Sequence, residues 1–332
     1  MPDLKLGSML CLALAWLALL PTPAAAAQAP AQAANAGDGP AAVWLVEAKV
    51  KRLFDSHTSY EFGNPFPPYQ EPLSRLEFDL DSWWGGVEIS RRAALWSLSL
   101  EIMRNLTAKV DGVMADSDWT DEESTKVRTI YSESCLDMKP SYAVRAEADF
   151  SLAPWLGLPA WLDLRPVGGL RWQRLDLMAH DGTQWALESD GSWPAMALPG
   201  DGLRFKQTYW QYFIGLKLDW RPLPARHPGL RLGLRGDWAY VDAHNLDHHL
   251  LREGNRLTEE KTRGQAWRAA LDLEAPLGGN FFLDLELDYL TIETTGNHRL
   301  YNDAIGLDFI VNNGVRVWSQ QCGVMLSLRY DF

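Results

Sequence analysis

Cysteine is scarce in this chain. Only three cysteines occur in 332 residues, and Cys11 lies in the N-terminal leader. Cys135 and Cys322 are too few to build a disulfide framework. Cys322 shares strand parity with the apolar residues Val324 and Leu326, so we expect a free thiol on an apolar outer face. Disulfides are therefore not expected to hold the fold together.

Beyond its first segment the chain also lacks long apolar runs. Lys5 precedes an apolar run over residues 9–20, and small residues follow up to residue 27. This layout predicts a secretory signal peptide over 1–27, followed by a low-complexity, flexible lead-in over 28–42. No later run reaches the roughly 18 apolar residues of a membrane helix. Residues 43–332 are therefore expected to form one domain of an exported protein.

Positive charge is in short supply as well. The chain has 31 Lys and Arg against 43 Asp and Glu, a net charge of −12 and a pI near 5.1. This balance argues against nucleic acid as a partner. A surface of one sign concentrates ligands of the opposite sign, which favours cationic polypeptides as partners.

Alternation of apolar and polar residues is what the chain has in abundance. In residues 230–240, Leu234 and Trp238 alternate with Arg235 and Asp237. Side chains alternate between the two faces of a strand, so such a strand has one apolar and one charged face. Ten segments are predicted as strands on this basis: 46–61, 74–90, 95–106, 142–152, 161–178, 207–220, 230–240, 267–274, 281–288 and 315–332.

The links between these strands alternate in length. Short links at 152–158 and 276–280 alternate with long ones, and the polar stretches 107–140 and 179–202 are expected as loops. A secreted β-sandwich also has alternating strands. Charge on the second face of strand after strand, together with a terminal Phe332, favours a barrel with a polar lumen. We predict an all-β fold, a ten-stranded antiparallel transmembrane β-barrel with long extracellular loops.

Two polar segments have the composition of a catalytic site. Asp247 and His249 are two residues apart and share a strand face, whereas His248 points the other way. An Asp that orients a His prepares a general base. Asp116 and Asp118 have the same spacing in another segment, and both segments are expected at the same rim of the barrel. Together the two pairs could hold a water molecule.

Each segment has a plainer interpretation. The acidic stretch 116–123 is also consistent with a solvated loop or a weak calcium site. Zinc could be bound by the cluster His244, Asp247, His248 and His249. However, neighbouring residues of a strand face opposite ways, and no cysteine or HExxH motif lies nearby. We therefore expect no metal.

With the segments GVMADSDWTD (112–121) and VDAHNLDHH (241–249) in this order, the chain resembles the omptins, ten-stranded outer-membrane endoproteases. The sequence GNHRLYND (296–303) and the closing LRYDF are also similar to omptin sequence. The resemblance implies that Asp247 and His249 form the catalytic dyad. It implies that Asp116 and Asp118 form the opposing carboxylate pair. A water molecule would then attack the peptide bond without a covalent intermediate.

The resemblance also implies two binding sites. Omptins prefer to cut beside basic residues, using two acidic groups in a substrate pocket. Glu61 matches one of these, but Asn245 stands where the family has the other, which predicts a relaxed preference. Arg174 and Arg263 match residues that hold lipopolysaccharide on the outer wall, whereas Thr208 replaces a third basic residue.

These observations predict an endopeptidase of a Gram-negative outer membrane that cuts near basic residues with its active site facing outside. No cofactor is expected, with lipopolysaccharide as an activator. The alternative is a non-catalytic barrel of the same fold that acts as an adhesin or structural protein. A diffusion porin is disfavoured, because ten strands lined with long charged side chains leave little lumen.

Overall fold

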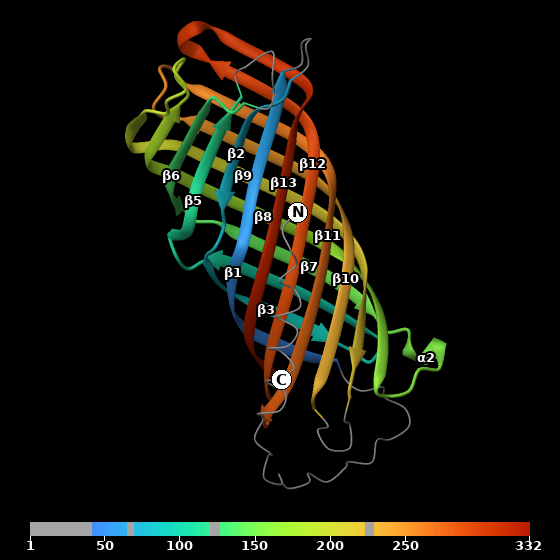
Figure 1. The fold of residues 1–332 in the computed structure, drawn as a ribbon. Coiled ribbons are helices and arrows are strands. Elements are labelled where there is room, and N and C mark those ends of the chain that lie inside the picture. Colours follow the sequence, from blue (N-terminus) through green and yellow to red (C-terminus); the bar gives the residue numbers. More distant parts are fainter. Residues whose placement is uncertain (1–41, 65–69, 120–126, 223–228) are drawn as a thin grey trace, which may run out of the picture. The chain divides into compact units, whose positions relative to one another are not determined.

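The computed structural model describes residues 42–64, 70–119, 127–222 and 229–332 (Figure 1). The predicted signal peptide, residues 1–27, lies outside the described residues. So do residues 28–41 of the lead-in and residues 121–123 of the acidic stretch. Among the described residues, no helix combines the length and apolar character needed to cross a bilayer.

Thirteen strands in the described part of the chain form one antiparallel ring, which closes where β1 pairs with β13. Seven strands are long: β1 (Val43–Asn64), β8 (Leu162–Ala186), β9 (Ala195–Trp220), β10 (Arg231–His249), β11 (Arg256–Gly278), β12 (Phe281–Asn302) and β13 (Leu307–Asp331). Six are short: β2 (Gln70–Asp79), β3 (Trp83–Arg92), β4 (Trp96–Asn105), β5 (Lys109–Asp118), β6 (Ile130–Met138) and β7 (Tyr142–Phe150). A short helix α2 (Ala153–Leu156) and a 3-10 turn η1 (Asp303–Ile305) complete the described elements.

The short strands lie end to end in twos, so that two of them together occupy the place of one long strand. β1 pairs with β2 over one half of its length and with β3 over the other, and β8 pairs in the same way with β6 and β7. Since β4 and β5 also follow each other, the six short strands fill three positions of the ring. The ring therefore has ten strand positions, and the prediction of a ten-stranded antiparallel barrel is confirmed.

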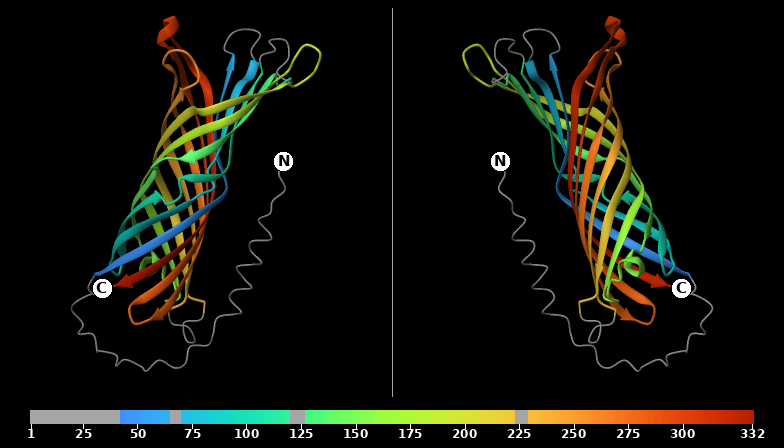
Figure 2. Two further views of the ribbon diagram at one scale, coloured as in Figure 1. Left: turned by 90° about the vertical axis from the view of Figure 1, so that its left-hand side faces the viewer. Right: turned by 90° about the vertical axis from the view of Figure 1, so that its right-hand side faces the viewer.

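The predicted loop over residues 107–140 is wrong, because most of it forms β5 and β6. Much of residues 179–202 likewise extends β8 and β9. These parts continue the strands past the apolar outer surface, where neither face has to be apolar. The alternation that marks the other strands is therefore missing from them. Figure 2 shows β12 and β13 extending in the same way at the end of the barrel opposite to the C-terminus.

A bulge in β1 reverses which residues face the lumen. Asp55 has a φ of 51°, and the pairing with β13 shifts between Phe54 and His57. The Asp81 carboxylate, between β2 and β3, accepts hydrogen bonds from the backbone N–H groups of Asp55 (3.1 Å) and Ser56 (2.9 Å). An extra residue shifts the side-chain alternation by one. Odd-numbered residues face the lumen below the bulge, and even-numbered residues face it above.

The outer surface carries an apolar belt. On β9 the outward residues from Trp210 to Trp220 are large, apolar and exposed, among them Ile214 and Leu216. This stretch spans roughly 33 Å along the strand, and strand tilt reduces its height to about the 25 Å of an outer-membrane apolar band. Beyond Trp210 the outward residues are polar, beginning with Thr208. Cys322 lies on the outer face of β13 as a free thiol, as expected.

Candidate active site

Asp247 and His249 lie at the end of β10, beyond the apolar belt. Asp247 Oδ2 is 3.3 Å from His249 Nε2. The Asp247 side chain is fully buried, whereas that of His249 is 20% exposed. Asp247 pairs with Phe205 of β9, which lies among the polar outward residues of that strand, beyond the apolar belt. Asp247 and His249 therefore lie outside the membrane-spanning segments. The geometry is that of a carboxylate orienting an imidazole.

Asp247 has a second partner that the sequence did not reveal. The hydroxyl of Tyr60, on β1, donates a hydrogen bond to Asp247 Oδ2, the same oxygen that faces His249. The other oxygen, Oδ1, has no hydrogen-bond partner among the described residues. Tyr60 reaches the lumen only because the bulge at Asp55 shifts the alternation of β1.

Asp116 and Asp118 lie at the end of β5, on the side of the ring away from β10. Burial raises the pKa of Asp116 to about 7, with Asp118 adding to the rise and His249 opposing it. Burial also raises the pKa of Asp118, opposed by a hydrogen bond from the Ser74 side chain. Asp116 interacts electrostatically with both Asp247 and His249. The structure therefore brings the two predicted pairs to the same end of the lumen.

The protonation of His249 follows from its neighbours. Burial acts to lower the pKa of His249, but the Asp247 carboxylate outweighs it, and the pKa lies above the usual value. Arg256 opposes the rise and Asp116 supports it. The neutral form that can accept a proton is therefore favoured at a higher pH than for a free histidine.

The two residues expected in the substrate pocket are not brought together. Glu61 follows Tyr60 and faces the outer side of the wall, where its Oε2 is 2.5 Å from Arg75 Nη2. Asn245 faces the lumen and is fully buried, and neither atom of its amide group has a partner among the described residues. The bulge in β1 accounts for the difference, because without it Glu61 would have the opposite orientation.

Asn245 instead belongs to a polar row across four strands. Its neighbours in the row are Gln207 on β9, Glu260 on β11 and His298 on β12. His298 Nδ1 is 3.0 Å from Glu260 Oε1, and the second oxygen of Glu260 has no partner among the described residues. Strand parity in β11, where Arg268 faces the lumen, was the signal that could have identified Glu260.

The four residues considered for zinc are divided between the two faces of β10. His244 faces outward and pairs with Glu259 at 2.9 Å, whereas Asp247 is buried in the lumen. Within the described residues, no group of three or more His, Cys, Asp or Glu is arranged to hold a metal ion.

Arg174 and Arg263 lie on the same outer wall just beyond the belt. Both are exposed, and Arg263, with 77% of its side chain accessible, pairs with Asp242 at 3.0 Å. Thr208 lies beside Arg174 in the next strand, in the position where the family has a third basic residue. The outward orientation expected for both arginines is thus present.

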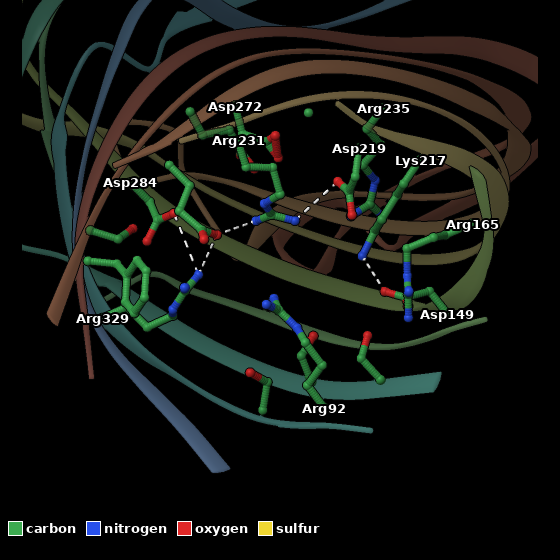
Figure 3. Close-up of a pocket in the computed structure, with 18 of the residues that line it drawn as sticks. Arg92, Asp149, Arg165, Lys217, Asp219, Arg231, Arg235, Asp272, Asp284 and Arg329 are labelled. Carbon is green, nitrogen blue, oxygen red and sulfur yellow. Dashed lines mark hydrogen bonds and ion pairs between the residues drawn. The ribbon is translucent and has the colours of Figure 1, made fainter. Parts of the chain in front are cut away.

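A cavity of about 730 Å³ occupies the opposite half of the lumen (Figure 3). Its walls are charged, and carboxylates and guanidinium groups neutralise one another across it. Arg329 is 2.5 Å from Glu274, Arg231 is 2.6 Å from the same carboxylate, and Lys217 is 2.9 Å from Asp149. This half of the lumen is lined by ion pairs and lies far along the strands from Asp247.

Known proteins resemble this chain in both sequence family and fold. The omptin family model matches residues 73–332. The outer membrane protease OmpT from Escherichia coli superimposes with a TM-score of 0.76 at 15% identity, covering 87% of this chain and 97% of that one. The translocator domain of the autotransporter NalP from Neisseria meningitidis reaches a TM-score of 0.33 at 10% identity, with 89% of each chain covered. No curated protein sequence matches the chain.

The family match covers most of the chain, and the OmpT match shows the same transmembrane barrel. The chain therefore belongs to the omptin family, the outer-membrane proteases of Gram-negative bacteria.

Proposed function

We propose that this protein is an endopeptidase in which His249, oriented by Asp247, activates a water molecule opposite Asp116 and Asp118. The observation that supports this most strongly is the placement of both pairs at one end of the lumen within electrostatic range of each other. The ring nitrogen of His249 that is turned away from Asp247 would take the proton from water. Asp116 and Asp118, with one shared proton near neutral pH, would position that water.

The active site would face the outside of the cell. The start of β1 and the end of β13 both lie at the rim opposite to the site. At the rim of the site, β8 and β9 continue past the apolar belt. Long extensions of this kind are typical of the external rim of outer-membrane barrels. Polypeptides outside the cell are therefore the proposed substrates.

A preference for basic residues beside the cleaved bond is proposed to be weak. Asn245 is neutral, and Glu61 is turned away from the lumen and paired with Arg75. The acidic character of the chain and the carboxylates around the dyad still favour cationic substrates over acidic ones.

Lipopolysaccharide is proposed as an activator held against Arg174 and Arg263. Both arginines are exposed just beyond the apolar belt, at the level where lipid phosphates lie. A guanidinium pairs well with phosphate oxygens. The surface on which they lie is the outer side of β8 and β11, and β10, between them, carries the dyad on its inner side.

The test is cleavage of a peptide library by refolded protein, with and without lipopolysaccharide. We expect His249→Ala and Asp247→Ala each to reduce kcat by about 10²–10⁴-fold, as is usual for loss of a general base. The matched control is His248→Ala, whose side chain faces the other way and which should retain most activity. Equal losses at His248 and His249 would contradict the dyad. No cleavage under any condition would favour the non-catalytic barrel.

A further inference from the structure

The fully buried Tyr60 shares one oxygen of the Asp247 carboxylate with His249. Its hydroxyl donates to Asp247 Oδ2, and His249 Nε2 lies 3.3 Å from that same atom. Asp247 Oδ1 has no partner among the described residues, so the two donors compete for one oxygen while the other has none.

The Tyr60 ring is fixed in this position by aromatic contacts. It stacks on Phe205 with ring centroids 5.6 Å apart, and Phe205 stacks on Phe78 at 4.4 Å. All three side chains are almost completely buried. The bulge at Asp55, closed by the Asp81 carboxylate, directs Tyr60 rather than Glu61 into the lumen. Residues of three strands, β1, β2 and β9, thus hold the Tyr60 ring and place its hydroxyl at Asp247.

We infer that Tyr60 is a positioning residue for the proposed dyad, holding the Asp247 carboxylate in place and weakening the pull of its shared oxygen on His249. The inference rests on the proposed function. A hydrogen bond from a neutral hydroxyl draws negative charge from the accepting oxygen. The imidazolium form of His249 is then stabilised less than it would be by an unshared carboxylate, which keeps more of His249 in its proton-accepting form.

Other charged groups lie around Asp247 and His249 and also influence how these two residues titrate. They are Asp116 and Asp118 on β5, Glu260 and Arg256 on β11, and Arg252 in the turn between β10 and β11. Tyr60→Phe leaves all of them in place, because the ring and its stacking on Phe205 are retained. A change in titration can therefore be assigned to the missing hydroxyl.

The experiment compares Tyr60→Phe with Tyr209→Phe. Tyr209 is an equally buried tyrosine on β9 whose hydroxyl lies near Thr58 and does not touch the dyad. We expect Tyr60→Phe to move the acidic limb of the kcat/KM profile upward by about 0.5–1 pH unit, with the lost activity partly recovered at alkaline pH. Tyr209→Phe should reproduce the wild-type profile.

A second readout does not depend on activity. The His249 ring can be titrated by NMR in folded, histidine-labelled protein, with its signal identified by its absence in His249→Ala. An upward shift in Tyr60→Phe alone supports the inference. Unchanged titration, or a loss of activity that is the same at every pH, overturns it. If His249→Ala retains activity, the proposed function fails instead.

Discussion

The two halves of the barrel lumen differ in how their charged and polar groups are paired. In the half within the apolar belt, acids and bases are matched, as Glu274 is with Arg231 and Arg329. In the half beyond the belt, Asp116 and Asp118 lie as two carboxyl groups side by side, and the amide of Asn245 has no partner in the part of the chain that the structure describes.

The difference between the two halves separates stability from function. Matched ions neutralise one another, and a carboxylate engaged with a guanidinium group is less available to react. Unmatched groups raise the free energy of the folded state, but they keep polar atoms available to a substrate and a water molecule. Each of the following predictions alters one half and leaves the other unchanged.

The largest stability effect is expected from Arg329→Met in the matched half. This change leaves the buried carboxylate of Glu274 with one partner fewer, and removing one member of a buried pair costs about 3–5 kcal/mol. The urea midpoint of the folded protein in lipid vesicles should fall, while kcat per folded molecule stays unchanged. The control is Arg316→Met on the same strand, whose exposed pair with Glu293 at 3.0 Å should contribute less than about 1 kcal/mol. Equal losses for both variants would contradict the matched-charge interpretation.

The opposite result is expected from Asp116→Asn in the unmatched half. The pKa of Asp116, about 7, is above its ordinary value of 3.8, so the folded state holds this proton more tightly than the unfolded chain. The resulting stabilisation is complete below about pH 4 and is lost as the pH rises through 7. Asparagine cannot ionise, so the variant should be more stable than the wild type at pH 8 by about 1–3 kcal/mol, yet poorly active. Unfolding titrations at pH 5 and pH 8 measure this, and a variant that is less stable at pH 8 would refute it.

The smallest effect is expected at the substrate pocket. Asn245→Asp adds a carboxylate to the lumen and should increase the preference for Arg or Lys beside the cleaved bond about fivefold, equivalent to about 1 kcal/mol. Glu61→Gln should leave this preference unchanged, because Glu61 faces outward against Arg75. The measurement is kcat/KM for peptides that differ only at that residue. A larger effect of Glu61→Gln than of Asn245→Asp would show that the resemblance, rather than the strand geometry, locates the pocket.

Strand parity predicted much of this arrangement from the sequence alone. It placed Asp247 and His249 on one face of their strand, the charged face, and His248 on the other. This worked because a membrane-spanning strand must have an apolar outer face, which fixes the alternation over its whole length.

Predictions from strand alternation failed beyond the apolar belt, where strands no longer need an apolar outer face. β5 and β6 were assigned to a loop, since strands beyond the belt need no apolar face. Glu61 was assigned to the pocket from the resemblance, and nothing in the sequence marks Asp55 as a bulge that turns Glu61 outward. The positive φ of Asp55 depends on Asp81, a partner distant in the chain. Tyr60 was missed for the same reason.

The bulge in β1 separates two stretches of one strand whose side chains are constrained by different surroundings. Below it, the sequence of β1 is constrained by the bilayer and by the ion pairs of the lumen. Above it, the alternation starts again with its own phase, and the side chains there are constrained by their packing around Asp247 and not by the bilayer. Inserting a single residue at this bulge would exchange the inward and outward side chains of β1 above it and leave the alternation below it unchanged. Selectivity in a barrel of this kind can thus diverge through changes in strand length as readily as through changes in side chain.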